Sequence, residues 1–200
     1  MNPKISIITS MNNKERILFF INLLNEYALN QNKSVFLPIF YVPKNFYLSK
    51  LIALLSGESY KIIETYLDPT LGVSHTTKEK INPTKFVNAI EKIRSSDLIM
   101  SKNKFSDETY LEFIFEHNSK YDCILIDDFD DFISSTPEDI ETIFNQIENY
   151  AKENQSEVIL FMNEKDIENY QIPKNYQIGK IENEIKITYN KENFSIEEID

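Results

Sequence analysis

Short, wholly apolar segments separated by stretches with helical periodicity constrain the fold of this chain most strongly. The apolar segments are rich in β-branched residues and lack polar alternation, which is typical of strands buried on both faces. The stretches between them place apolar residues three and four positions apart, as amphipathic helices do. Strands are predicted within residues 5–8, 34–42, 97–101, 121–132 and 157–163, and helices within 15–29, 45–57, 59–67, 84–96, 106–120 and 136–154. This alternation predicts an α/β fold with a mostly parallel central sheet flanked by helices.

The last 25 residues differ from the rest of the chain. Residues 176–190 predict an antiparallel hairpin that turns near Glu182–Asn183. Residues 191–200 form an acidic tail that also carries Phe194, Ile196 and Ile199. Because no repeat or linker interrupts the sequence, we expect one domain over residues 1–190, followed by the acidic C-terminal tail 191–200.

Charge and composition exclude several classes of function. The formal net charge is -11, whereas a general nucleic-acid binder needs a basic footprint to neutralise phosphates. Direct DNA binding is therefore not expected. No apolar run approaches the roughly 20 residues of a membrane span, and the first residues lack the pattern of a signal peptide. With a single cysteine, Cys123, the sequence predicts a cytoplasmic protein without an internal disulfide.

Three consecutive regions carry a resemblance to a known family. They are "VFLPIFYVPKNFYLSKLIALLSG" (35–57), "FSDETYLEFIFEHNSKYDCILIDDFDDF" (105–132) and "EDIETIFNQIENYAKENQSEVILFMN" (138–163). In order and spacing they resemble the C-terminal ATPase domain of replicative DNA helicases, the DnaB-like branch of the RecA fold. The resemblance implies a single RecA-like domain and directs attention to the residues that follow each strand.

The family's Walker A loop would fall on "TSMNNKE" (9–15), which ends with Asn12, Asn13, Lys14 and Glu15. A working loop uses glycines to wrap backbone N–H groups around phosphates, then Lys, then a hydroxyl for magnesium. Lys14 stands where the family's lysine belongs, but Asn13 replaces the glycine and Glu15 the hydroxyl residue. A shift of one residue also fails, because it puts Asn13 in the lysine position. We therefore expect a degenerate Walker A motif.

The resemblance also assigns the family's other chemical positions. The catalytic glutamate is replaced by Tyr41, whose phenol is a poor base at neutral pH. The Walker B aspartate matches Asp127, and the phosphate-sensing glutamine corresponds to Asn163. The trans-acting finger residues correspond to Tyr189 and Lys191, and a lysine lacks the two-pronged grip of an arginine.

The acidic run "DDFDD" (127–131) has two interpretations that the sequence leaves open. Carboxylates suit hard cations, but neighbours at a strand end point to opposite faces, so we favour a solvated acidic loop over a metal site. Asp127 alone is either a remnant of Walker B or a helix-capping carboxylate. We assign no catalytic residue and no metal site.

These features favour a non-catalytic helicase-like protein that acts by protein contact in DNA replication or repair, as an accessory, adaptor or inhibitor. Its expected partner is a replicative helicase or another replisome subunit, and no cofactor is expected. The alternative is a divergent ATP-binding protein or ATPase of the DnaB-like family, with Lys14 and Asp127 as residual contacts for ATP and magnesium. A structural subunit without a link to replication is a third interpretation.

Overall fold

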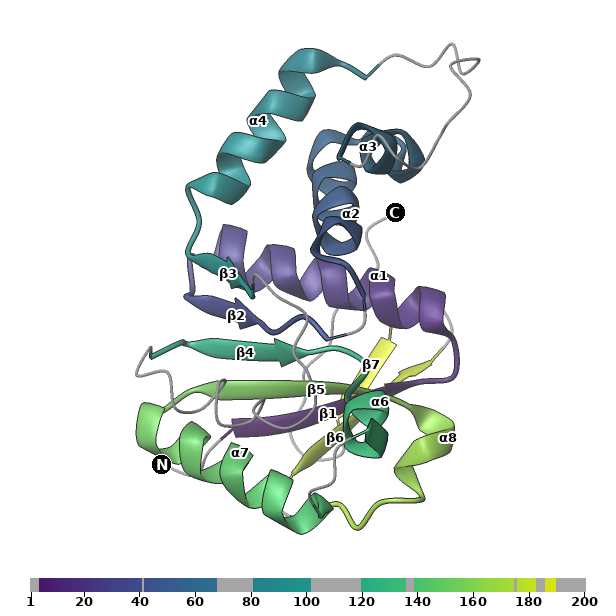
Figure 1. Ribbon diagram of the computed structural model, residues 1–200, viewed down its shortest axis with the longest axis vertical. Coiled ribbons are helices and arrows are strands. Elements are labelled where there is room, and N and C mark those ends of the chain that lie inside the picture. Colours follow the sequence, from purple (N-terminus) through teal and green to yellow (C-terminus); the bar gives the residue numbers. More distant parts are fainter. Residues whose placement is uncertain are drawn as a thin grey trace.

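A computed structural model describes residues 4–40, 42–67, 81–101, 120–135, 139–174, 176–182 and 186–189. Its centre is a sheet with strand order β3-β2-β4-β5-β1-β6-β7 (Figure 1). The strands are β1 (Lys4–Ser10), β2 (Val35–Leu37), β3 (Leu98–Met100), β4 (Cys123–Ile126), β5 (Glu157–Asn163), β6 (Gln177–Glu182) and β7 (Lys186–Tyr189). The first six strands in this order run parallel. The prediction of an α/β fold with a mostly parallel sheet is confirmed.

The edge formed by β6 and β7 differs from the rest of the sheet, because these two strands pair antiparallel, with Gly179 opposite Tyr189. The turn that would join them, residues 183–185, lies outside the described residues. The sequence places the predicted hairpin over 176–190, so only its strands can be compared with the structure.

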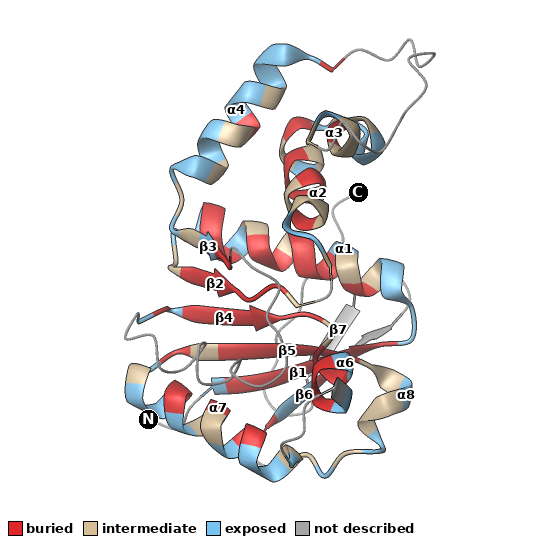
Figure 2. Ribbon diagram, in the orientation of Figure 1, coloured by how far each residue is buried: buried red, intermediate tan, exposed pale blue. Residues whose placement is uncertain are grey.

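Helices cover both faces of the sheet, because the strands are apolar on both sides. One face carries α1 (Asn13–Leu24), its continuation η1 (Asn25–Asn30, a π-helix) and α2 (Lys44–Ser56). The other face carries α6 (Phe129–Ser135) and α7 (Ile140–Asn154). Figure 2 shows the result as buried central strands between helices that are buried on one side and exposed on the other.

Three further helices lie away from the main core. Helices α3 (Tyr60–Leu67) and α4 (Pro83–Arg94) pack with α2 around a small cluster formed by Ile52, Ile63, Ile81 and Ala89. The short helix α8 (Glu164–Ile167) follows β5 directly. Helix α4 extends away from the sheet at the β3 side (Figure 1). Within the described residues, no helix is both long and apolar enough to cross a bilayer.

The element boundaries show where tertiary context changes a sequence-based assignment. The strand expected over 34–42 forms only at Val35–Leu37, because Pro38 has no N–H with which to continue a ladder. The helix expected over 15–29 begins earlier, at Asn13. The helix expected over 106–120 lies almost wholly outside the described residues.

Candidate functional site

The carboxyl ends of the parallel strands bring most of the predicted site residues to one edge, which we call the carboxyl edge of the sheet. Ser10 at the end of β1 pairs in register with Asn163 at the end of β5. Strand β4 neighbours β5, and Asp127 follows its last residue, Ile126. Ligands of open α/β sheets bind at such an edge, so its local chemistry decides what this chain can hold.

The loop between β1 and α1 is closed on itself by side chains. Asn12 is the N-cap of α1, and its Oδ1 accepts a 2.9 Å hydrogen bond from the Lys14 N–H. The Asn12 Nδ2 donates to Glu15 Oε1 at 3.1 Å. Ser10 Oγ accepts from the Asn12 N–H at 3.1 Å and donates to the Asn12 carbonyl at 3.0 Å. Amide groups that a phosphate would need at this helix start are therefore bonded within the loop.

Arg16, on the first turn of α1, points into the protein and is only 4% exposed. Its Nη2 donates a hydrogen bond to Asp128 Oδ1. Its Nε lies 3.3 Å from Asp127 Oδ1, as an ion pair rather than a directed hydrogen bond. A buried guanidinium is stable only when it is paired, and here one cation serves two carboxylates from the turn after β4.

Tyr47, on α2, completes the arrangement around Asp127. Its hydroxyl donates to Asp127 Oδ2 at 3.1 Å, and both residues are almost fully buried. Both carboxylate oxygens of Asp127 thus contact the side chain of a neighbouring element. We call Arg16, Tyr47, Asp127 and Asp128 the Arg16 cluster.

The backbone at Asp128 positions the acidic turn. Asp128 has a φ of 51°, in the left-handed region, which Asp tolerates better than most residues. This conformation turns the chain out of β4, and α6 begins at the next residue, Phe129. The Phe132 N–H bonds the Asp128 carbonyl at 3.1 Å, so the start of α6 and the Arg16 cluster share one residue.

Burial and charge set the protonation of the cluster. Burial raises the pKa of Asp127 to about 6, although Arg16 acts in the opposite direction. Burial by itself would lower the pKa of Arg16, but Asp127 and Asp128 more than offset this, so the guanidinium stays charged. Burial, followed by the charge of Asp127, raises the pKa of Tyr47 far above its usual range, so its hydroxyl remains a donor. The cluster therefore holds a permanent cation next to a carboxylate that titrates near neutrality.

Two further carboxylates on α6 extend the acidic environment. Burial raises the pKa of Asp130 and of Asp131 above the usual range of an aspartate. Asp130 is buried and interacts with the charge of Arg16 and with the Asn163 backbone. No group of three or more His, Cys, Asp or Glu residues in the described part of the chain has the arrangement of a metal site.

The remaining predicted site residues have different locations. Lys14 and Asn13 are exposed at the start of α1, and Glu15 is half-buried there. Asn163 is the N-cap of α8, and its Oδ1 accepts from the Lys165 N–H at 3.1 Å.

Three of the predicted positions are not brought to this site by the described structure. Tyr41 and Lys191 lie outside the described residues. Tyr189 is the last residue of β7, which β5, β1 and β6 separate from β4.

The sequence interpretation missed Arg16 and Tyr47. Arg16 lies four and eight residues before Phe20 and Leu24, on the buried stripe of α1, and Tyr47 lies four before the buried Leu51 on α2. A polar residue on an apolar helical stripe was the available signal. For Asp127, the open choice between a Walker B position and a cap is answered by contacts: its side chain meets Arg16 and Tyr47, with a further bond from the Asp128 backbone.

Comparisons with known proteins were informative only at the level of structure. No protein-family model matches the chain, and no curated protein matches it by sequence. The fold resembles a solved ATPase domain of a DnaB-like helicase, with a TM-score of 0.63 and 13% identity over 89% of this chain and 69% of that one.

Two further solved structures have the same arrangement. A DnaB-like replicative helicase, described with its interactions with primase, gives a TM-score of 0.61 at 12% identity; the match covers 90% of this chain and 46% of the helicase. The flagellar accessory protein FlaH from Methanocaldococcus jannaschii gives 0.51 at 14% identity, over 89% of this chain and 71% of FlaH. This chain thus has the RecA-like fold found in the ATPase domains of DnaB-like helicases.

Proposed function

We propose that this chain is a non-catalytic helicase-like protein that does not hold Mg-ATP and acts by protein contact in DNA replication or repair. The observation that carries the proposal is the pairing of Arg16 with Asp127 and Asp128. In the resemblance, Asp127 corresponds to the aspartate that serves the magnesium ion. In this chain an arginine side chain occupies the vicinity of that carboxylate.

The energetics of the Arg16 cluster oppose metal binding at Asp127. A magnesium ion there would have to displace Arg16, and a buried charge deprived of its partner costs about 3–5 kcal/mol. It would also have to compete with the Tyr47 hydroxyl for Asp127 Oδ2. These costs are absent from a site whose carboxylate faces solvent.

The β1–α1 loop opposes phosphate binding for a separate reason. Its Asn12 side chain already accepts from the Lys14 N–H, and Asn13 replaces the glycine that a close backbone approach to phosphate needs. The Glu15 carboxylate adds like charge beside any polyphosphate. The residues present therefore do not fit Mg-ATP, and we derive no catalytic step through it.

A role through contact follows from what the fold retains. A RecA-like domain that lacks its nucleotide still presents the surfaces of that fold, and the helicase of similar structure is described with its primase interactions. We propose a replicative helicase or another replisome subunit as the partner. The net charge of -11 would favour and orient approach to a basic surface.

Affinity capture from a lysate of the source cells tests this role. The full chain serves as bait, an unrelated protein of similar size and net charge is the matched control, and retained proteins are identified by mass spectrometry. We expect a replicative helicase, primase or other replisome subunit to be enriched over the control. If no replication protein is enriched, the proposed role is wrong.

The second candidate is a divergent ATP-binding protein or ATPase, which the fold similarity favours. Lys14 is exposed on the first turn of α1, and Asp127 lies at the end of β4, as residual phosphate and magnesium contacts would. Isothermal titration with Mg-ATP distinguishes the two candidates. Micromolar binding by the wild type that is lost in both Lys14→Ala and Asp127→Ala would establish the second; absence of binding in the wild type favours the first.

A further inference from the structure

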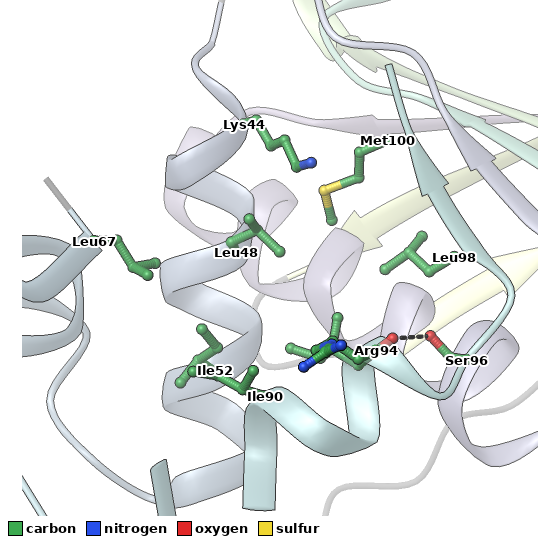
Figure 3. Close-up of a pocket in the computed structure, with 10 residues that line it drawn as sticks. Lys44, Leu48, Ile52, Leu67, Ile90, Arg94, Ser96, Leu98 and Met100 are labelled. Atoms are coloured by element: carbon green, nitrogen blue, oxygen red, sulfur yellow. Dashed lines mark hydrogen bonds between the residues drawn. The ribbon is translucent and has the colours of Figure 1, made fainter. Parts of the chain in front are cut away.

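A groove between α2, α4 and strand β3 lies outside the Arg16 cluster. Its volume is about 360 Å³ and its lining includes Leu48, Ile52, Ile90, Ile93, Leu98 and Met100. Figure 3 shows these apolar side chains facing a common space from the two helices and the strand. We call it the α2–α4 groove. Its size is within the range of about 300–1,000 Å³ typical of ligand sites.

The rim of the α2–α4 groove is cationic. Lys44, at the start of α2, and Arg94, at the end of α4, both line it and both are exposed. Neither side chain takes part in an ion pair within the described residues. An apolar groove with two unpaired cations at its rim suits an acidic peptide with apolar side chains.

This chain carries such a peptide in residues 191–200, "KENFSIEEID". Phe194 and Ile196 are two residues apart, so an extended backbone turns them to the same side. Glu197 and Glu198 follow directly and supply the opposite charge to Lys44 and Arg94. We propose that the segment 191–200 docks in the α2–α4 groove of a second copy of this chain.

Geometry decides that the groove belongs to a second copy. Strand β7, which ends at Tyr189, and strand β3, which lines the groove, are at opposite ends of the strand order. Six strand spacings separate them, which is roughly 29 Å at about 4.8 Å each. The five residues from Tyr189 to Phe194 span at most roughly 18 Å. Phe194 therefore falls short of its own groove.

A contact of this kind is head-to-tail, since the segment of one copy meets the groove of the next. Such contacts build rings or open chains rather than two-fold dimers. Self-association should therefore increase with protein concentration beyond a dimer, and it should weaken with added salt because the rim contacts are exposed ion pairs.

Sedimentation velocity of the full chain over roughly 1 μM to 1 mM tests the proposal, in the range of weak protein contacts. The wild type should associate, and Phe194→Ser/Ile196→Ser should remain monomeric at every concentration. Arg94→Glu should weaken association at least tenfold. The matched control is Lys85→Glu, an exposed residue of α4 that does not line the groove; it should associate as the wild type does.

A charge exchange makes the assignment specific. A mixture of Arg94→Glu with a Glu197→Lys/Glu198→Lys chain should recover association that Arg94→Glu alone lacks. Far-ultraviolet circular dichroism of each variant confirms that it is folded. A monomeric wild type, or an association that survives both the segment and the groove substitutions, overturns the proposal; in the second case another surface joins the copies.

Discussion

Arg16 is a buried cation whose partners come from a turn more than a hundred residues later in the chain, since 112 positions separate it from Asp128. Desolvating a guanidinium and two carboxylates costs several kcal/mol, which their mutual attraction offsets only while all of them remain in place. The cluster is therefore weak support for overall stability, but the protein should be strongly sensitive to the loss of one member.

Replacing Arg16 with methionine should destabilise the protein by about 3–5 kcal/mol, because Asp127 is left buried without its cation. Urea-induced unfolding at neutral pH measures the loss. Lys14→Met is the matched control: Lys14 is exposed on the same helical turn, and its substitution should stay within about 0.5 kcal/mol. Equal effects of the two substitutions would show that Arg16 is not held in the cluster.

The stability contribution of Asp127 should decrease as the pH rises. Its pKa is raised to about 6 in the folded protein, so the native state binds a proton that the unfolded chain releases at lower pH. Stability linked to Asp127 is thus full below the ordinary aspartate pKa and is lost as the pH passes through the folded value. Relative to Asp127→Asn, the wild type should lose up to about 3 kcal/mol between about pH 4 and pH 7.

Unfolding of both proteins by urea at several pH values gives this difference directly. The comparison cancels the contributions of other titrating groups that the two proteins share. If the wild type instead gains stability relative to Asp127→Asn as the pH rises, Arg16 lowers the pKa of Asp127 more than burial raises it.

At the scale of elements, helix α1 shows how local chemistry closes the site. The helix begins where Asn12 caps it, and the Asn12–Glu15 side-chain bond adds a second contact across the first turn. The layout of strand, loop and helix could be predicted from the alternation of apolar and helical segments, because those patterns are local. The orientation of Arg16 could not, because it depends on Asp127 and Asp128 from the turn between β4 and α6.

Asn12→Ala should destabilise the protein by about 1 kcal/mol, since the Lys14 N–H loses its acceptor. Asn13→Ala, one residue later and exposed, is the control and should change stability little. Thermal unfolding monitored by circular dichroism ranks the two variants. A larger loss for Asn13→Ala would contradict the assignment of Asn12 as the cap.

Two helix ends of the same backbone geometry should respond in opposite directions. Gly57 ends α2 with a φ of 68°, and a Cβ there would meet no heavy atom within 4 Å, so Gly57→Ala should cost about 1 kcal/mol through backbone strain alone. Gln155 ends α7 with a φ of 56°, and Gln155→Gly should stabilise by up to about 1 kcal/mol. Chemical denaturation of both variants checks the signs; the same sign for both would contradict the two left-handed caps.

At the scale of the whole molecule, the fold is more predictable than the site. The central strands β4 and β5 are buried on both faces, and that burial leaves a clear apolar signal in the sequence. The carboxyl edge depends on strand order, which brings Ser10, Asp127 and Asn163 together from three distant positions. The sequence predicted the residues at that edge through their resemblance to a helicase domain, but it did not show the arginine that pairs with Asp127.

The central claim is that Arg16 and Asn12 occupy the places that Mg-ATP would need. Co-crystallisation with magnesium and a non-hydrolysable ATP analogue tests it most directly. The account predicts that Arg16 remains paired with Asp127 and Asp128, and that no nucleotide lies at the start of α1. Electron density for a triphosphate between Lys14 and Asp127, with Arg16 displaced, would contradict it.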